Sequence, residues 1–279
     1  MDIERIDELL SSVAAEEVMP RFGRLSTAEI TRKSSAFDIV TAADRAVEDA
    51  VSSAVGKLWP GTVVVGEEAA DRDPASARQL LGAESVLVLD PLDGTKNFAS
   101  GLPLFAVMAA VMKHGRIVGG VIHDPVTRTS AVAEEGGGAW LKRDGHEARR
   151  LHVAAPVPLN EMEAIAGTRF VKEPLRSVLS ANLFRIAGHT WFRCAGHEYR
   201  LAAEGHVHLL CYNRLMPWDH APGWLLHKEA GGHSAHFDGS AYAPARMSGG
   251  LLYAPDEESW HVARDALLVD AGRPAWQPE

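Results

Sequence analysis

Carboxylates stand behind apolar runs in three separate parts of this sequence. Asp90 and Asp93 follow the four apolar residues 86–89. Glu67 ends a second apolar run, and Asp219 follows Met-Pro-Trp. A carboxylate at the end of a buried strand is costly to desolvate unless a counter-charge or strong donors neutralise it. Carboxylates that gather at the carboxyl ends of strands suit a hard divalent cation such as Mg²⁺, so the sequence predicts a cation site.

The residues between and after the two aspartates predict how they are presented. Pro91 locks φ and interrupts regular strand geometry, so Asp90 and Asp93 need not point to opposite faces. Gly94 permits a tight turn, and Thr95 can begin a short helix. The amides of Gly94 and Thr95 would then face outward at a helix start, where they suit a phosphate group. A metal on the aspartate side would neutralise the carboxylates, and it would lie next to the phosphate on the amide side.

The elements that position these residues follow from the spacing of apolar residues. Helices are expected over residues 3–20, 41–58, 75–81, 174–182, 197–204 and 221–230. Strands are expected over residues 62–65, 86–89, 104–112, 116–124, 129–134, 138–141, 163–166, 183–186 and 207–210. The polar segment 31–35 is expected to be a loop. Alternating strands and helices with hairpins predict an α/β (α+β) layered fold with mixed sheets.

Composition sets the outer limits. The 279 residues are 46% hydrophobic and 23% charged, as in an ordinary globular protein. A formal charge of −9 argues against nucleic acid or an anionic membrane as partner. Two cysteines without a CxxC pair, no apolar leader and no window near the roughly 20 apolar residues of a membrane span predict a cytoplasmic protein. A proline-rich stretch near residue 155 suggests two halves, 1–153 and 154–279.

Several motifs together resemble one family. They are GEE (66–68), DPLDGTKNF (90–98), WDHAPG (218–223) and EAGG (229–232). In this order and spacing they are similar to the motifs of the inositol monophosphatase family, which are metal-dependent phosphatases of sugars and polyols. KSS (33–35) and TAAD (41–44) resemble the family's N-terminal loop and helix start. The resemblance covers about residues 5 to 270 and implies a layered α-β-α-β-α sandwich, commonly a homodimer.

The resemblance also implies the metal ligands of a phosphomonoesterase that uses two or three Mg²⁺ ions. Glu67, Asp90 and the Leu92 carbonyl would hold the first ion. Asp90, Asp93 and Asp219 would hold the second. Glu67 would share a third, more weakly held ion, and it therefore counts among the catalytic residues as well. No motif offers a Ser–His or Cys–His pair, so the expected nucleophile is a metal-activated water.

Further roles implied by the resemblance concern that water and the phosphate. Thr95, hydrogen-bonded to Asp44, would orient the attacking water. Phosphate would lie against Asp93, the Gly94 amide and Thr95. Lys33, in the N-terminal loop, is a possible contact of the water network at the metal site.

Departures from the family pattern bear on the substrate. Inositol-cleaving members place a glutamate about seven residues before the WD aspartate, and here that position holds Tyr212. Residues 193–196 read RCAG where a GTAA-like run of small residues is commoner. Arg214 offers a cation to an acidic or doubly phosphorylated substrate. His220 lies beside the predicted site and is expected to reach the substrate.

These observations predict a Mg²⁺-dependent, lithium-sensitive phosphatase of a small polyol or sugar monophosphate. Inositol-1-phosphate is the leading single candidate. Histidinol phosphate, fructose-1,6-bisphosphate and adenosine 3',5'-bisphosphate remain alternatives within the same chemistry. A non-catalytic regulator that keeps the fold and binds a protein partner such as RNA polymerase is the alternative from another class. Its mark would be a lost metal ligand, and every ligand position is filled here.

Overall fold

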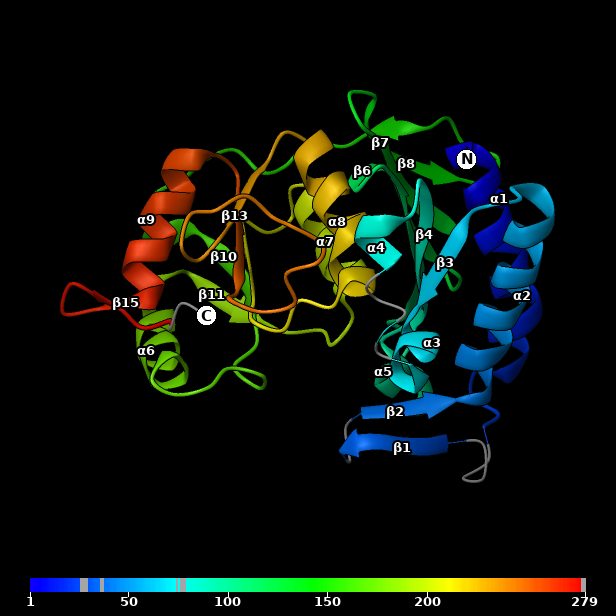
Figure 1. Ribbon diagram of the computed structural model, residues 1–279. Coiled ribbons are helices and arrows are strands. Elements are labelled where there is room, and N and C mark those ends of the chain that lie inside the picture. Colours follow the sequence, from blue (N-terminus) through cyan, green and yellow to red (C-terminus); the bar gives the residue numbers. More distant parts are fainter. Residues whose placement is uncertain (26–29, 36–37, 74, 76–78, 277–279) are drawn as a thin grey trace.

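Helices and sheets alternate as five layers in the computed structural model, which describes residues 1–25, 30–35, 38–73, 75 and 79–276 (Figure 1). Helices α1 (Ile3–Val13) and α2 (Ala42–Leu58) form one outer layer. A seven-stranded sheet, the helices α7 and α8, a five-stranded sheet and the helices α6 and α9 follow in that order. The α-β-α-β-α sandwich with mixed sheets is therefore confirmed.

The large sheet carries the first two acidic motifs. Its strands run side by side in chain order from β3 to β9. β3 and β4 are parallel, and every later neighbour is antiparallel. The strands are β3 (Val63–Gly66), β4 (Ser85–Asp93), β5 (Ala106–Lys113), β6 (Arg116–Asp124), β7 (Thr129–Glu134), β8 (Gly138–Arg143) and β9 (Arg149–Arg150).

Strand β4 is apolar at successive positions because both of its faces are covered. Leu87 and Leu89 belong to the core that α1 and α2 complete. Val86 and Val88 belong to the core between the two sheets. A strand buried on both faces needs apolar residues without alternation, and its carboxyl end then delivers the aspartates into the interior.

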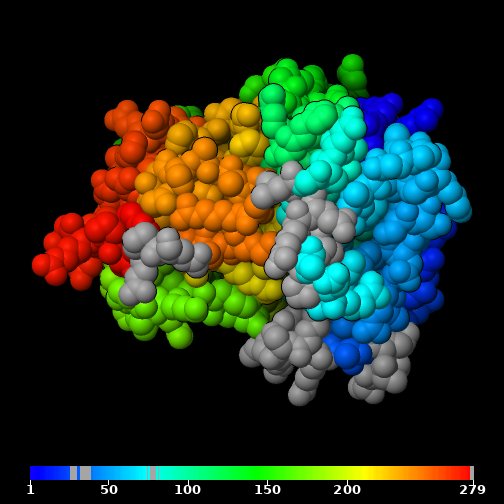
Figure 2. All heavy atoms as spheres, in the orientation of Figure 1, coloured from blue at the N-terminus to red at the C-terminus, as the bar shows by residue number. Residues whose placement is uncertain are grey.

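The second half supplies the small sheet and the remaining layers. The sheet order is β11-β10-β12-β14-β13, with parallel pairs at β10 and antiparallel pairs at β14. Its strands are β10 (Glu163–Ala166), β11 (Gly188–Thr190), β12 (Leu209–Tyr212), β13 (His233–His236) and β14 (Leu251–Ala254). The helices are α6 (Leu175–Asn182), α7 (Ala195–Ala203), α8 (Pro217–Glu229) and α9 (Glu257–Leu268). In Figure 2 the N-terminal part of the chain, in blue and cyan, lies on the right, and the C-terminal part, in orange and red, lies on the left.

Shorter elements complete the described chain. After α1 the chain continues as a π-helical turn and a 3₁₀ turn to residue 21, so helical structure spans the expected 3–20. The short elements are α3 (Glu67–Arg72), α4 (Gln79–Gly82), α5 (Thr95–Ala99), β15 (Val269–Asp270) and β16 (Arg273–Pro274). Of the helix expected over 75–81, only its end is seen as α4, and 76–78 lie outside the described residues. Within the described chain, no helix has the length and apolar character needed to cross a bilayer.

Three local expectations are wrong. The segment 31–35 is not a loop but part of β1 (Ile30–Ser35), which pairs with β2 (Asp38–Thr41); main-chain pairing forms this hairpin without an apolar pattern. Residues 183–186 are not a strand, because Leu183–Arg185 forms a 3₁₀ turn that buries Leu183 and Ile186 on one side. Helix α8 begins at Pro217 rather than near 221, since proline suits a first helical position.

The buried His227 of α8 predicts a pH dependence of stability. It is 1% exposed, its Nδ1 has no hydrogen-bond partner among the described residues, and burial lowers its pKa to about 3. Below pH 6.5, His227 binds a proton in the unfolded chain but stays neutral in the folded protein. The free energy of unfolding therefore falls as the pH falls. From pH 6.5 to 5 this group removes roughly 2 kcal/mol.

Urea unfolding at pH 6.5 and pH 5 measures this loss. His227→Gln should show a shallower loss of unfolding free energy between the two pH values. His146→Gln, which changes an exposed histidine, should keep the loss of the unaltered protein. Equal pH dependence of His227→Gln and the unaltered protein would contradict the assignment.

Candidate active site

Parallel pairing brings Glu67 and Asp90 to one edge of the large sheet. Gly66 of β3 is in register with Leu89 of β4. The next residue on each strand is therefore Glu67, at the start of α3, and Asp90. Two carboxylates from separate motifs thus meet where the two strands end.

A bulge in β4 brings Asp93 to the same place. Asp90 pairs with Met108 and Asp93 pairs with Ala106, so three steps along β4 match two steps along β5. One extra residue on β4 shifts the side-chain alternation, as expected from Pro91. Asp90 and Asp93 accordingly line one cavity.

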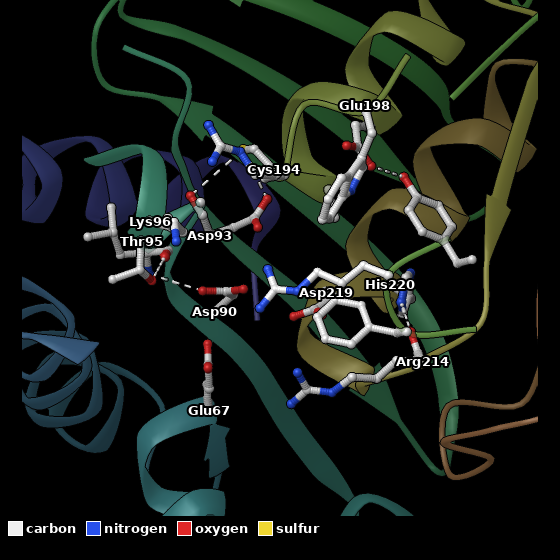
Figure 3. A pocket seen from close by; sticks show the side chains of 18 of the residues that line it. Glu67, Asp90, Asp93, Thr95, Lys96, Cys194, Glu198, Arg214, Asp219 and His220 are labelled. Carbon is white, nitrogen blue, oxygen red and sulfur yellow. Dashed lines mark hydrogen bonds between the residues drawn. The ribbon is translucent and has the colours of Figure 1, made fainter. Parts of the chain in front are cut away.

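Helix α8 supplies the fourth carboxylate. Asp219 lies in the first turn, and Met216 rather than Asp219 occupies the N-cap position. Figure 3 shows Asp219 facing the same space as Glu67, Asp90 and Asp93. A helix start also favours negative charge through its dipole.

The cavity between these carboxylates measures about 200 Å³. It brings together ten of the residues predicted from the sequence. They are Glu67, Asp90, Leu92, Asp93, Gly94, Thr95, Tyr212, Arg214, Asp219 and His220. Asp44 lies behind Thr95, and the side chain of Lys33 lies outside the described part of the chain.

Asp90 is the electrostatic centre of the site. It is 1% exposed, and no cationic side chain of the described residues lies within 4.0 Å of its carboxylate. Burial raises its pKa well above the usual range, and the charges of Glu67, Asp93 and Asp219 raise it further. Four carboxylates and a backbone carbonyl form an all-oxygen donor set, which fits a hard divalent cation.

Helix α7 fixes Asp93. The Gly196 amide donates to Asp93 Oδ2 at 2.6 Å, and the Cys194 thiol lies 3.1 Å from the same oxygen. A Cβ at Gly196 would stand 2.6 Å from Met108 Sδ and 2.9 Å from Ala106 Cβ, so only glycine admits this approach. Gly196 belongs to the RCAG segment in which the sequence departs from the family pattern. The sequence alone did not connect this segment to Asp93.

Thr95 and Asp44 form the hydrogen bond that the resemblance implies. Thr95 Oγ1 lies 3.0 Å from Asp44 Oδ1 and 2.8 Å from the Leu92 carbonyl. The other carboxylate oxygen of Asp44 accepts from the amide and hydroxyl of Thr41 in a capping box at the start of α2. Burial raises the pKa of Asp44 to about 6. The chain turns between Leu92 and Thr95 at Gly94, which has a φ of +82°.

A second group of acids surrounds Glu67. One carboxylate oxygen of each of Glu67, Glu68 and Asp71 lies within 4.8 Å of the others. The Glu68 amide donates to Glu48 Oε2 of α2 at 2.9 Å, which fixes the backbone beside Glu67. Sequence reasoning missed Glu48, since a glutamate on a helix carries no signal of such a long-range contact.

The geometry corrects the expected role of His220. Its Nε2 donates to the Arg214 carbonyl at 2.9 Å, because a carbonyl only accepts. Its Nδ1 therefore accepts from the Tyr199 hydroxyl at 2.8 Å. Burial lowers the pKa of His220 to about 4, so the ring is neutral. Both nitrogens are occupied, and His220 positions the Arg214 backbone instead of binding substrate through a nitrogen.

Tyr212 lines the cavity but its hydroxyl is also engaged. It donates to Glu198 Oε2 at 2.9 Å, while Glu198 Oε1 accepts from the Phe192 amide at 3.0 Å. Glu198 is 1% exposed and burial raises its pKa to about 8. Sequence reasoning missed Glu198 and three cavity-lining cations, Lys96, Arg169 and Arg193.

Comparisons with known proteins agree with this fold and site. The family model described as "Inositol monophosphatase family" matches residues 2–270. An inositol-1-monophosphatase of Mesorhizobium japonicum is 32% identical over 262 residues, covering 91% of this chain and 90% of the relative. The Nus factor SuhB of Pseudomonas aeruginosa is 35% identical, covering 81% and 82%. The crystal structure of the extragenic suppressor protein suhB from Bartonella henselae superposes with a TM-score of 0.79 at 25% identity, covering 94% and 98%.

Fold and site together define a layered α/β phosphatase with an all-oxygen, carboxylate-rich centre. The chain belongs to the inositol monophosphatase family. It is a phosphoric ester hydrolase of that type.

Close packing at Gly196 predicts the cost of a single methyl group. Gly196→Ala should lower the free energy of unfolding in urea by about 1–3 kcal/mol, because the methyl overlaps Met108 and Ala106. Gly188→Ala is the matched control, since a Cβ there meets no atom within 4 Å. Its effect should stay within about 0.5 kcal/mol. Equal stability of the two variants would show that α7 does not lie this close to β5.

Proposed function

We propose that the protein is a Mg²⁺-dependent phosphomonoesterase that hydrolyses a small phosphorylated polyol, sugar or related alcohol. One observation carries the proposal. Asp90 is buried among Glu67, Asp93 and Asp219 with no cationic side chain of the described residues within 4.0 Å of it. Such a group of carboxylates needs a bound cation, and a phosphate ester needs cations to accept an anionic transition state.

Glu67, Asp90, the Leu92 carbonyl, Asp93 and Asp219 would hold two or three Mg²⁺ ions. When bound, such ions lower the pKa of a water and stabilise the departing alcohol oxygen. The chain's own contribution is orientation. Because Asp93 is held by the Gly196 amide, it enters the site in one fixed position.

Thr95 would accept a hydrogen bond from the attacking water while donating its own proton to Asp44. Burial keeps the pKa of Asp44 near 6, so this carboxylate is an acceptor at neutral pH. The amides of Gly94 and Thr95 would bind phosphate oxygens at the turn where Gly94 takes its positive φ. We also propose a cytoplasmic homodimer inhibited by lithium, on the resemblance to the family alone.

A regulatory role is the alternative from another class, since two relatives are named Nus factors. A regulator that had lost catalysis would be free to lose ligands. All predicted ligand residues line the cavity here, which favours the enzyme. Among substrates, inositol-1-phosphate stands beside histidinol phosphate, fructose-1,6-bisphosphate and adenosine 3',5'-bisphosphate.

Phosphate release from these four esters tests the proposal. Release should require Mg²⁺ and stop with EDTA. Asp93→Asn should lower it by at least about 100-fold, because the variant loses a charged ligand. The rise in melting temperature that Mg²⁺ causes should shrink in parallel, since a cation that binds only the folded chain stabilises it.

Asp265→Asn is the matched control, because Asp265 is exposed on α9 and pairs with its neighbour Arg264. It should keep both the activity and the Mg²⁺-induced stabilisation. Release that persists in EDTA, or an Asp93→Asn variant as active as the unaltered protein, would refute the metal assignment. No release from any ester would favour the regulator.

A further inference from the structure

Four cationic side chains also line the cavity. Lys96, Arg169, Arg193 and Arg214 all line it together with the acidic residues. Partial desolvation lowers the pKa of Lys96, and the charges of Arg169 and Arg193 lower it further. Three of the four cations therefore lie close enough to repel one another.

Phe170 gathers two of these side chains at the cavity. The guanidinium of Arg169 lies 4.9 Å from the centre of the Phe170 ring, and that of Arg214 lies 5.6 Å from it. Phe170 itself is 47% exposed. A guanidinium held over an aromatic face keeps its hydrogen-bond donors available at the ring's edge.

Arg193 and Arg214 have no carboxylate within 4.0 Å among the residues that the structure describes. They therefore form no ion pair with the acidic residues of the cavity. Lys96 and Arg169 have other contacts and add positive charge to the cavity lining.

The backbones of these two arginines are held in place. Arg193 has a φ of +60°, a left-handed conformation that is unfavourable for a residue with a side chain. Arg214 has its carbonyl fixed by His220, which the Tyr199 hydroxyl fixes in turn. The left-handed backbone at Arg193 and the buried hydrogen bonds behind Arg214 indicate that each backbone is held in one conformation.

We propose that the phosphate ester carries a second anionic group, a phosphate or a carboxylate, on the alcohol that is released, and that Arg193 and Arg214 bind it. This inference rests on the proposed phosphatase function and narrows its substrate. A guanidinium matches the two oxygens of a carboxylate or phosphate. A neutral polyol would leave both arginines without an ionic partner, and the ammonium group of histidinol phosphate would be repelled.

Steady-state kinetics with Mg²⁺ on three kinds of ester test this inference. Fructose-1,6-bisphosphate and adenosine 3',5'-bisphosphate carry a second phosphate, and 3-phosphoglycerate carries a carboxylate. The alcohol part of inositol-1-phosphate is neutral. The alcohol part of histidinol phosphate carries an ammonium group and is cationic. We expect kcat/KM to be at least about 10-fold higher for a substrate of the first kind, about what one added ionic contact contributes. Comparing the bisphosphates with 3-phosphoglycerate identifies the anion.

For each variant we compare one ratio. It is kcat/KM for the best substrate with two anionic groups divided by kcat/KM for inositol-1-phosphate. Arg214→Gln and Arg193→Gln should each lower this ratio at least about 10-fold, mainly through KM. Arg214→Lys keeps the charge and should retain part of the ratio. Arg185→Gln, an exposed arginine of the same half that does not line the cavity, should leave it unchanged.

The outcomes separate the two proposals. Release from inositol-1-phosphate or histidinol phosphate at equal or higher efficiency would overturn the second-anion inference and leave the phosphatase function standing. A ratio that neither arginine variant changes would overturn it as well. Absence of release from every ester would refute the phosphatase function, and this inference with it.

Discussion

The cost of burying Asp90 among other carboxylates is the constraint on which the rest of this structure depends. Burying one ionised carboxylate without a cation already costs folding free energy. The negative charges of three acidic neighbours raise that cost further. The chain tolerates this because rigid elements fix the positions of the acids. β4 is buried on both faces by two separate cores, so its end cannot move to relieve the repulsion. Glu67 and Asp219 begin helices, where negative charge is favoured.

Hydrogen bonds to the protein fix several of these acids. Asp93 accepts from the Gly196 amide, and Asp44 accepts from Thr41 and Thr95. Glu48 holds the backbone beside Glu67. These contacts join α2, the large sheet and α7, which are three of the five layers. The sandwich is therefore the means by which distant segments reach one centre with fixed geometry.

Sequence reasoning succeeded where local physics determines the outcome. The apolar runs of β4, β5 and β6 predict buried strands, and Pro91 predicts the interruption that the bulge supplies. It failed at β1, whose polar residues pair through the main chain, and at the start of α8. Arg169 and Glu198 were missed because only the packing of α7 and the loop after β10 brings them to the cavity. His220 was misjudged because its partners, Tyr199 and the Arg214 carbonyl, are set by tertiary contacts.

The buried Glu198 helps to explain how acidic and basic side chains line one small cavity. Burial raises its pKa to about 8, so near neutral pH this side chain is mostly protonated and adds little negative charge. Its carboxyl group accepts a hydrogen bond from the Tyr212 hydroxyl, which carries no charge. Because neither residue offers an anion, neither cancels the positive charge of Arg193 and Arg214. The carboxylates of the cavity can then attract cations while these arginines attract anions.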